Sequence, residues 1–355
     1  MSYSLSLNFE RKKSDILIES GLLKKMGKLI KKHYPGKKIM IVTDETIYSI
    51  YGPTLEEQIK EAGSERDLII LPFGDAGKTQ DTLFRVYKKL LESRFTRDDV
   101  ILAFGGGAIG DVAGMAASTY LRGISLVNLP TTLTAQADSS MGGKNAINLP
   151  EGKNLIGTYY QAENIWIDPK FLRTLDEKNM SSGMGEVIKY ALIADLDFFE
   201  ELLLGVDLEK QDVLEDIIYR CCMIKKSFIE EDELELGNRL LLNFGHTLGH
   251  GIERYYDFTG VFHGEAIAMG MYTLTKHTEE MKITKEGTAD LIRDVLDVYK
   301  LPSTLPENMD KGRLYDMTLH DKKSRGSEIN LIVLKKIGDP LIHTIEHGDL
   351  KEYLA

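Results

Sequence analysis

The sequence predicts an α/β plus all-α fold, with an N-terminal parallel-sheet domain over residues 1–172 and a mainly helical domain over residues 173–355. Two observations predict it. In the first half, short runs rich in β-branched residues alternate with longer helical patterns, which is typical of a parallel sheet. After about residue 172 these runs disappear, and apolar residues recur at spacings of three and four, as on one face of a helix.

In the first domain, the expected strands lie in KKIMIVTD, DLIILPF, DVILAFGGG, ISLVNLP and ENIWID, and the expected helices in TIYSIYGPTLEEQIKEAG and TQDTLFRVYKKLLESR. Residues 138–154 have no helical period, and we interpret them as an ordered functional loop. In the second domain, residues 185–205 and 213–233 are expected to be helical. The turn around Pro169 is the expected hinge, and the cleft between the domains is the expected active site.

Composition excludes several classes of protein. The 55 Asp and Glu residues exceed the 44 Lys and Arg residues, and the net charge of −11 argues against a general nucleic-acid binder. The two cysteines are adjacent and offer no disulfide framework, which fits a reducing cytoplasm. The first residues lack the apolar stretch of a signal peptide, and no apolar run approaches the roughly 18 residues that span a membrane. We therefore expect a soluble, cytoplasmic protein.

A glycine-rich turn is the first candidate binding feature. Gly105, Gly106, Gly107 and Gly110 follow a strand and open a helix, where backbone N–H groups and the helix dipole can hold a pyrophosphate. The acidic residue usually found about 20 positions later is missing, so Asp44, at the end of an earlier strand, is the alternative ribose partner. Alternatively, the glycines only permit tight packing and Asp44 only caps the next helix.

Polar and basic residues gather in the loop that follows, and such residues suit phosphate or carboxylate binding. A solvated loop with incidental lysines is the alternative. The residues concerned are Thr131, Thr132, Asp138, Ser139, Ser140, Gly142, Gly143, Lys144, Lys153 and Asn154.

The second domain carries a candidate metal site. His246 and His250 lie four apart on an expected helix, and His263 begins another. Glu186 lies in an apolar helical stretch, where an unpaired carboxylate would be costly, with Lys189 on the same face. Two imidazoles and one carboxylate, with one position left open, are typical of catalytic Zn²⁺. The alternative is a Glu186–Lys189 ion pair beside histidines of the core.

Five other histidines have no local partner in the sequence and are expected to have surface or packing roles. They are His33, His277, His320, His343 and His347.

Taken together, the motifs GGGAIGDVAG, TYLRGISLVNLPTTLTAQADSSMGGKNAINL, GKNLIGTYYQ, GEVIKY, LLNFGHTLGHGIE, HGEAIAMG and HDKK resemble those of the 3-dehydroquinate synthases, in matching order from about residue 10 to the end. The resemblance implies a nucleotide-binding α/β domain and a helical metal-binding domain, assembled as a homodimer. The implied reaction converts 3-deoxy-D-arabino-heptulosonate 7-phosphate into 3-dehydroquinate and phosphate, the second step of the shikimate route to aromatic amino acids.

In the implied mechanism, NAD⁺ takes a hydride from C5, phosphate is eliminated, and the hydride returns before ring opening and aldol closure. The implied metal, Zn²⁺ or alternatively Co²⁺, is held by Glu186, His246 and His263 and polarises the C5 oxygen. His250 then carries a proton or contacts phosphate and is not a ligand.

The remaining roles implied by the resemblance cover three sets of residues. The catalytic set is His250, Lys144, Lys189 and Asn243. The substrate-binding set is Asp138, Lys144, Asn154, Lys189, Lys225, Arg239, Asn243, His250 and Lys323, with Arg122 reaching across a dimer interface. The NAD-binding set is Asp44, Asp75, Lys78, Gly106, Gly107, Ala108, Asp111, Thr131, Thr132, Lys153 and Thr174.

Three positions depart from the family pattern. Asp75 replaces a common Glu, Asn179 replaces an acidic cofactor contact, and Met115 replaces a usual Phe. Three rival functions share parts of the pattern: another sugar-phosphate cyclase, a metal-dependent polyol or glycerol-1-phosphate dehydrogenase, and a nucleotide-binding protein that has kept the fold without catalysis. DSSMGGK and Lys225 favour the dehydroquinate reaction over other cyclisations.

Overall fold

The computed structural model describes residues 2–10, 12–319, 324–325 and 327–354. The chain divides into two compact units. Unit 1 contains Met1–Leu175 and Glu209–Cys222, and unit 2 contains Asp176–Leu208 and Met223–Ala355. The sequence placed one domain change after residue 172, whereas the contacts place the first change after Leu175 and return Glu209–Cys222 to unit 1.

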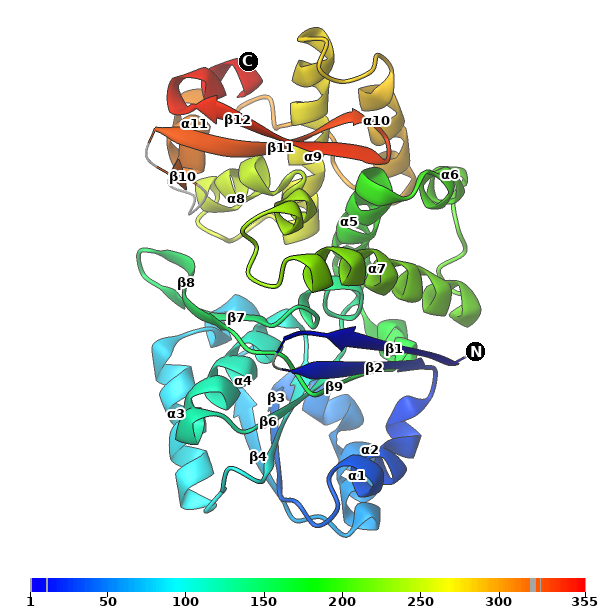
Figure 1. The fold of residues 1–355 in the computed structure, drawn as a ribbon, viewed down its shortest axis with the longest axis vertical. Helices are drawn as coiled ribbons and strands as arrows, with labels where there is room; N and C mark the ends of the chain where they lie inside the picture. The colour runs from blue at the N-terminus through cyan, green and yellow to red at the C-terminus, as the bar shows by residue number, and fades with distance from the viewer. Residues whose placement is uncertain (1, 11, 320–323, 326, 355) are drawn as a thin grey trace. The chain divides into compact units, whose positions relative to one another are not determined.

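Unit 1 is built on a seven-stranded sheet, as Figure 1 shows. Every pair of neighbouring strands in this sheet is parallel except β1 and β2, which pair antiparallel. This arrangement confirms the predicted parallel sheet. In spatial order the strands are β1 (Ser2–Asn8), β2 (Lys13–Glu19), β9 (Asn164–Ile167), β6 (Ser125–Pro130), β5 (Val100–Gly105), β3 (Ile39–Asp44) and β4 (Arg66–Leu71).

Helices cover both faces of this sheet (Figure 1). One face packs against α1 (Met26–His33) and α2 (Glu45–Ala62), where Ile41, Leu102 and Trp166 belong to one buried apolar cluster with residues of both helices. The other face carries α3 (Gln80–Glu92) and α4 (Gly107–Thr119). Because both faces are covered, the central strands β3 and β5 are buried at every position, as expected for parallel strands.

The interpretation of residues 138–154 as a loop is wrong in part. A short π-helical segment, η4 (Ala135–Ser139), is followed by an antiparallel hairpin of β7 (Lys144–Leu149) and β8 (Gly152–Tyr159). Glycine, lysine and asparagine hide the alternation of these strands, because they are polar or poor strand formers. The hairpin packs against α4, which supplies the apolar surface that the strands need.

Unit 2 is mainly helical, as predicted, but it also contains a three-stranded antiparallel sheet that the sequence analysis missed. Its strands are β10 (Ser324–Arg325), β11 (Glu328–Lys336) and β12 (Asp339–Glu346). Leu331 and Val333 of β11 join Leu248 and Met269 in one buried core. The helices are α5 (Glu177–Ala194), α6 (Leu196–Leu204), α8 (His246–Tyr255), α9 (His263–Glu280), α10 (Thr288–Val298) and α11 (Lys311–Leu319), and α7 (Gln211–Glu231) runs from unit 1 into unit 2.

Short 3-10 segments complete the described chain. They are η1 (Leu22–Lys25), η2 (Gly74–Gly77), η3 (Tyr120–Arg122), η5 (Pro169–Thr174), η6 (Asn238–Asn243) and η7 (His347–Leu354). Among the described helices, none has the length and apolar character needed to cross a lipid bilayer.

Candidate functional site

The glycine turn joins β5 to α4 at the carboxyl edge of the sheet of unit 1. Gly105 ends β5, Gly106 stands at the N-cap, and α4 begins at Gly107. A Cβ atom on Gly107 would lie 2.9 Å from the Ser139 hydroxyl oxygen, and one on Gly105 would lie 2.6 Å from the Ile109 side chain. The glycines therefore bring the N-terminus of α4 close to β5 and to η4, with backbone N–H groups available to an anion.

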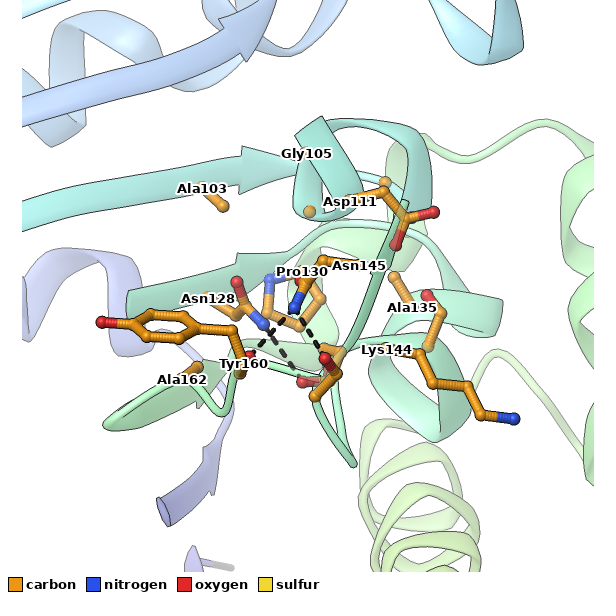
Figure 2. A pocket seen from close by; sticks show the side chains of 16 residues that line it. Ala103, Gly105, Asp111, Asn128, Pro130, Ala135, Lys144, Asn145, Tyr160 and Ala162 are labelled. Carbon is orange, nitrogen blue, oxygen red and sulfur yellow. Dashed lines mark hydrogen bonds between the residues drawn. The ribbon is translucent and has the colours of Figure 1, made fainter. Parts of the chain in front are cut away.

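A pocket of about 380 Å³, partly open to solvent, lies beside this turn (Figure 2). Three buried oxygen atoms around it, Asn128 Oδ1, Ser139 Oγ and Ser140 Oγ, accept or donate no hydrogen bond within the described part of the chain. Buried polar atoms are normally satisfied, so these three indicate a ligand or ordered water. Asp111 and Lys144 also line the pocket.

Asp44 ends β3 and caps α2, with Oδ1 accepting a hydrogen bond of 3.0 Å from the Ile47 backbone N–H. The capping role, the alternative considered from the sequence, is therefore present. Burial raises the pKa of Asp44, although the backbone N–H groups of Ile47 and Thr46 oppose this shift. Capping leaves room for a ribose contact, because a carboxylate accepts several hydrogen bonds.

Ion pairs connect the hairpin to the segment around η2. Lys78 Nζ lies 2.5 Å from Asp111 Oδ2 and 2.6 Å from Asn154 Oδ1. Lys153 Nζ lies 2.5 Å from Asp75 Oδ2. The structure therefore brings five predicted ligand-binding residues of unit 1 together in two groups of polar contacts.

The predicted metal ligands converge in unit 2. Glu186 comes from α5, His246 begins α8 and His263 begins α9. Glu186 Oε1 lies 3.4 Å from His246 Nε2 and 3.2 Å from His263 Nε2, and Lys189 Nζ lies 2.7 Å from Glu186 Oε2. Each of the three offers one ligand atom within 4.8 Å of the others.

Glycines next to these residues let the three helices approach closely. A Cβ atom on Gly185 would lie 2.8 Å from the Gly264 carbonyl oxygen, and one on Gly264 would overlap the Ser182 carbonyl oxygen. Between α8 and α9, a Cβ atom on Gly270 would overlap the Gly245 carbonyl oxygen. Gly185, Gly245 and Gly264 each adjoin one of the candidate ligands, so the close helix crossings place these ligands directly.

The hydrogen bonds of both imidazoles favour metal binding. His246 Nδ1 lies 3.1 Å from the Phe244 carbonyl oxygen, and His263 Nδ1 lies 3.2 Å from Glu253 Oε2. A carbonyl can only accept, so Nδ1 of His246 carries the proton and Nε2 presents its lone pair toward Glu186. This donor set, two Nε2 atoms and a carboxylate oxygen, fits a catalytic divalent metal with an open position.

Charges in the cluster shift its pKa values in different directions. Burial lowers the pKa of His246 to about 4, although Glu186 opposes the shift. Burial also disfavours charge on His263, but Glu253 and Glu186 outweigh it and raise the pKa of His263 to about 10. Burial alone would raise the pKa of Glu186, yet Lys189 and the two imidazoles hold it well below its usual range. Glu186 is thus a charged carboxylate in a buried place, ready to accept a cation.

The other predicted residues of unit 2 lie around η6 and α8. Arg239 is fully buried, donates from its backbone to Asp232 and from its guanidinium to the Glu233 carbonyl. Asn243 donates to Glu235 Oε1 over 2.8 Å. The His250 ring lies 5.5 Å from that of His246 and 6.0 Å from that of His263, between centroids.

Several predicted residues remain apart from these clusters or undescribed. Arg122 is exposed on η3 with φ +67°, and Thr174 hydrogen-bonds Tyr51 over 2.8 Å. Lys225 is buried on α7, and Asp138 lies in η4. Lys323 and His320 lie outside the described residues.

Sequence reasoning missed Glu253, Asn128 and Asn145. Glu253 is buried and contacts His263, and its spacing of three from His250 in HGIE was a signal that placed it on the histidine-bearing face. Asn128 and Asn145 are buried beside the pocket (Figure 2). No local signal marked these two asparagines: Asn128 is an isolated polar residue in a predicted strand, and Asn145 lies in a strand that was not predicted.

Solved structures with a similar fold define the class of this chain. A 2-deoxy-scyllo-inosose synthase complexed with carbaglucose-6-phosphate, NAD⁺ and Co²⁺ is 25% identical, with a TM-score of 0.90 over 99% of both chains. A 2-epi-5-epi-valiolone synthase from Streptomyces hygroscopicus with NAD⁺ and Zn²⁺ is 25% identical, with a TM-score of 0.88 over 98% of this chain and 97% of that one. A butanol dehydrogenase from Thermotoga maritima shares only the fold, at 14% identity and a TM-score of 0.65 over 96% and 95% of the two chains. The fold and the metal cluster thus define a sugar phosphate cyclase.

Sequence comparison identifies the family within this class. Residues 68–182 match the 3-dehydroquinate synthase N-terminal model, and residues 183–324 match the C-terminal model. The 3-dehydroquinate synthase of Clostridium acetobutylicum is 44% identical over 99% of both chains, and that of Clostridium kluyveri is 45% identical over 94% of this chain and 93% of its own. The chain belongs to the 3-dehydroquinate synthase family. The family, the fold class and the function predicted from the sequence are confirmed.

Proposed function

We propose that the chain converts 3-deoxy-D-arabino-heptulosonate 7-phosphate into 3-dehydroquinate and inorganic phosphate, with NAD and a divalent metal, Zn²⁺ or Co²⁺, as cofactors. The observation that carries this proposal is the convergence of Glu186, His246 and His263 on one point of unit 2. The membership of the family and the NAD⁺ and metal in the related cyclase structures support it. The reaction has no net change of redox state, so NAD is needed only in catalytic amount.

Glu186, His246 and His263 would hold the metal. When bound, the metal supplies a Lewis acid that polarises the C5 oxygen of the substrate. Lys189 lies beside Glu186 and helps to keep this carboxylate charged, and its own ammonium group would be available to a substrate hydroxyl bound at the metal. Glu186 can therefore stay ionised in the protein interior and remains available to bind the metal cation.

The N-terminus of α4 would hold the pyrophosphate of NAD, with Gly106, Gly107 and Ala108 offering backbone N–H groups. When bound, NAD supplies the hydride acceptor and donor. Asp44 would contact a ribose, and the further contacts are assigned to Asp75, Lys78, Asp111, Thr131, Thr132, Lys153 and Thr174.

The substrate carries a phosphate and a carboxylate, and the residues assigned to it are mostly cations, which bind such groups through charge-assisted hydrogen bonds. The family resemblance assigns His250 to move a proton, and its position on the same helix as His246, outside the Glu186 cluster, is compatible with that role. Lys144, Lys189 and Asn243 are its catalytic partners. The remaining substrate contacts are Arg122, Asp138, Asn154, Lys225, Arg239 and Lys323.

The two lysines of unit 1 that are assigned to NAD already make polar contacts within the protein. Lys78 and Lys153 are assigned to NAD, but each now holds a partner of its own: Asp111 and Asn154 for Lys78, and Asp75 for Lys153. These contacts restrain the two lysine side chains before a ligand binds, which lowers the entropic cost of binding.

The assembly and location of the enzyme complete the proposal. We assign it to the cytoplasm, as a homodimer in which Arg122 contributes to the partner's site. Arg122 suits this role because it is exposed and held in a left-handed backbone conformation, φ +67°, next to Leu121 at φ +50°. Light scattering of the purified chain should give twice the monomer mass of 39.9 kDa, and a monomer mass would contradict the dimer.

The metal requirement tests the proposal. Treatment with a chelator should abolish phosphate release from the heptulosonate phosphate in the presence of NAD. Added Zn²⁺ or Co²⁺ should restore it, because two imidazoles and a carboxylate bind both ions. Unchanged phosphate release after complete removal of metal would overturn the assignment of Glu186, His246 and His263.

A further inference from the structure

Glu253 lies on α8, one helical turn after His250, and its side chain is buried. Its Oε2 atom lies 3.2 Å from His263 Nδ1, while the other nitrogen of the same ring, Nε2, lies 3.2 Å from Glu186 Oε1. The His263 ring is therefore held between two carboxylates on opposite sides.

The two histidines of the cluster differ in how they are restrained. His246 has only 11% of its side chain exposed, and the backbone carbonyl of Phe244 accepts from its Nδ1. His263 has 33% of its side chain exposed and is the first residue of α9, where the helix itself restrains it least. The Glu253 carboxylate faces His263 Nδ1 in the same way as the Phe244 carbonyl oxygen faces His246 Nδ1.

We infer that Glu253 is a positioning residue, which fixes the Nδ1–H tautomer and the orientation of His263 so that Nε2 faces the metal position. In the metal-bound form the ring keeps one proton, and a carboxylate that accepts from Nδ1 holds that proton there, so that Nε2 offers its lone pair to the metal. This inference rests on the metal site of the proposed function and extends it by one residue.

The same atoms offer a competing arrangement. His250, Glu253 and His263 also present ligand atoms within 4.8 Å of one another, as a second ion would require. Such an ion would need Nδ1 of His263, the atom that holds the hydrogen bond to Glu253. The two arrangements therefore exclude each other and predict different numbers of bound ions.

Zinc affinity tests the inference without any need for activity. Zn²⁺ binding is measured by competition with a chromogenic chelator, in the absence of NAD and substrate, for the full chain and for Glu253→Ala and Glu253→Gln. Loss of such an outer partner typically weakens metal binding by about 10- to 100-fold. We expect that loss for Glu253→Ala and a smaller one for Glu253→Gln, whose amide oxygen still accepts from Nδ1.

Glu265→Gln is the matched control. Glu265 lies in the same first turn of α9 as His263, but its Oε2 accepts from the Phe262 backbone N–H over 2.8 Å. The side-chain oxygen of glutamine can accept the same hydrogen bond from the N-cap backbone, so zinc affinity should not change. The absorption of the Co²⁺-loaded protein should shift in Glu253→Gln and stay unchanged in Glu265→Gln, which separates ligand geometry from folding.

Each outcome decides one point. Equal zinc affinity of Glu253→Gln, Glu253→Ala and Glu265→Gln would overturn the inference. Two zinc ions on the unmodified chain, with one lost in Glu253→Ala, would overturn it in favour of a second ion. Failure of the unmodified chain to bind zinc at all would instead contradict the metal site of the proposed function.

Discussion

Lys189 and Glu186 show how single residues prepare the metal site. Both side chains are almost fully buried, and their charged atoms lie 2.7 Å apart. Burying two charges costs several kcal/mol per ion unless they are well paired, so this pair is not there for stability alone. The Lys189 ammonium also lies 4.3 Å from the centroid of the Tyr190 ring. These contacts keep the Glu186 carboxylate charged in the protein interior, where it can bind a metal cation.

At the same scale, His246→Ala and His250→Ala form a matched pair, since the residues are one turn apart on α8. His246→Ala should lose bound metal, because the Nε2 atom that faces Glu186 disappears. His250→Ala should keep the metal and still slow turnover by about 100-fold or more, the contribution of a typical proton-transfer group. Metal content by mass spectrometry and phosphate release check both. Loss of metal from His250→Ala would contradict the choice of ligands.

The candidate ligands were predictable residue by residue because each lies in a distinctive local pattern. Histidines four apart on a helix and a glutamate in an apolar helix interior are visible in the letters. The contact between Glu253 and His263 was not predictable, because it joins two helices, α8 and α9, whose crossing is not determined by any local sequence pattern. Asp44 could be interpreted as a helix cap or as a ribose contact, and its observed capping of α2 does not exclude the ribose contact.

Among the elements, the crossings of α5, α8 and α9 set the geometry of the metal cluster. The glycines at these crossings permit backbones to approach where any side chain would collide, as at Gly264 against Ser182. Helices that pack through their side chains typically have axes about 8–10 Å apart. Glycine at the crossing allows the two axes to come closer. The position of Glu186 relative to His263 therefore depends on a missing Cβ atom.

Gly264→Ala tests this dependence. The added methyl would overlap the Ser182 carbonyl oxygen, so α9 must move away from α5. We expect a loss of about 2 kcal/mol of folding free energy, within the range for overpacking, together with loss of zinc affinity. Denaturant unfolding and chelator competition measure the two effects. Gly348→Ala is the control, because its Cβ atom would meet nothing within 4 Å. Normal zinc binding by Gly264→Ala would contradict this account of the cluster.

The first turn of α5 supplies a pH-dependent prediction. Asp176 caps this helix, and its hydrogen bond from the Asn179 backbone N–H lowers its pKa below the ordinary value of 3.8. A lowered pKa contributes stability above the unfolded pKa, and this contribution is lost as the pH falls through the lower folded value. Asp176→Ala should therefore cost about 1 kcal/mol at neutral pH and less in acid.

Asp176→Asn separates capping from charge. Asparagine caps about as well as aspartate but does not titrate. Urea unfolding between pH 7 and pH 3 should show a smaller loss of stability for Asp176→Asn than for the unmodified chain. Parallel pH curves for the two proteins would exclude a contribution from the Asp176 charge.

Elements with a strong period were predictable, and those stabilised by distant contacts were not. The parallel strands and the long helices of both units follow the predicted pattern. The hairpin of β7 and β8 escaped because its polar strands depend on α4 for packing. The β11 strand contains the apolar run INLIVL. It was not predicted, because the surrounding sequence has a mainly helical pattern. The β1–β2 pair begins the chain with an alternating pattern, SYSLSLN, that was overlooked.

For the whole molecule, the sequence motifs carried more information than their spacing. Without the motifs, a dehydrogenase is the more natural interpretation of a nucleotide site combined with a metal site, although a cyclase needs both as well. The ordered match along the chain separated them, and the TM-scores of 0.90 for a cyclase and 0.65 for a dehydrogenase agree with it. Each unit holds one candidate site: the glycine turn lies in unit 1, and the candidate metal cluster lies in unit 2.

The balance of phosphate and NADH tests the central claim most directly. The chain is incubated with the heptulosonate phosphate and NAD at a small fraction of the substrate concentration. Phosphate and product mass are measured while absorbance follows NADH. The account predicts one phosphate per substrate consumed, many turnovers for each NAD, and no accumulation of NADH, because the hydride returns to the substrate. NADH formed in step with substrate oxidation, without release of phosphate, would identify a dehydrogenase and contradict the account.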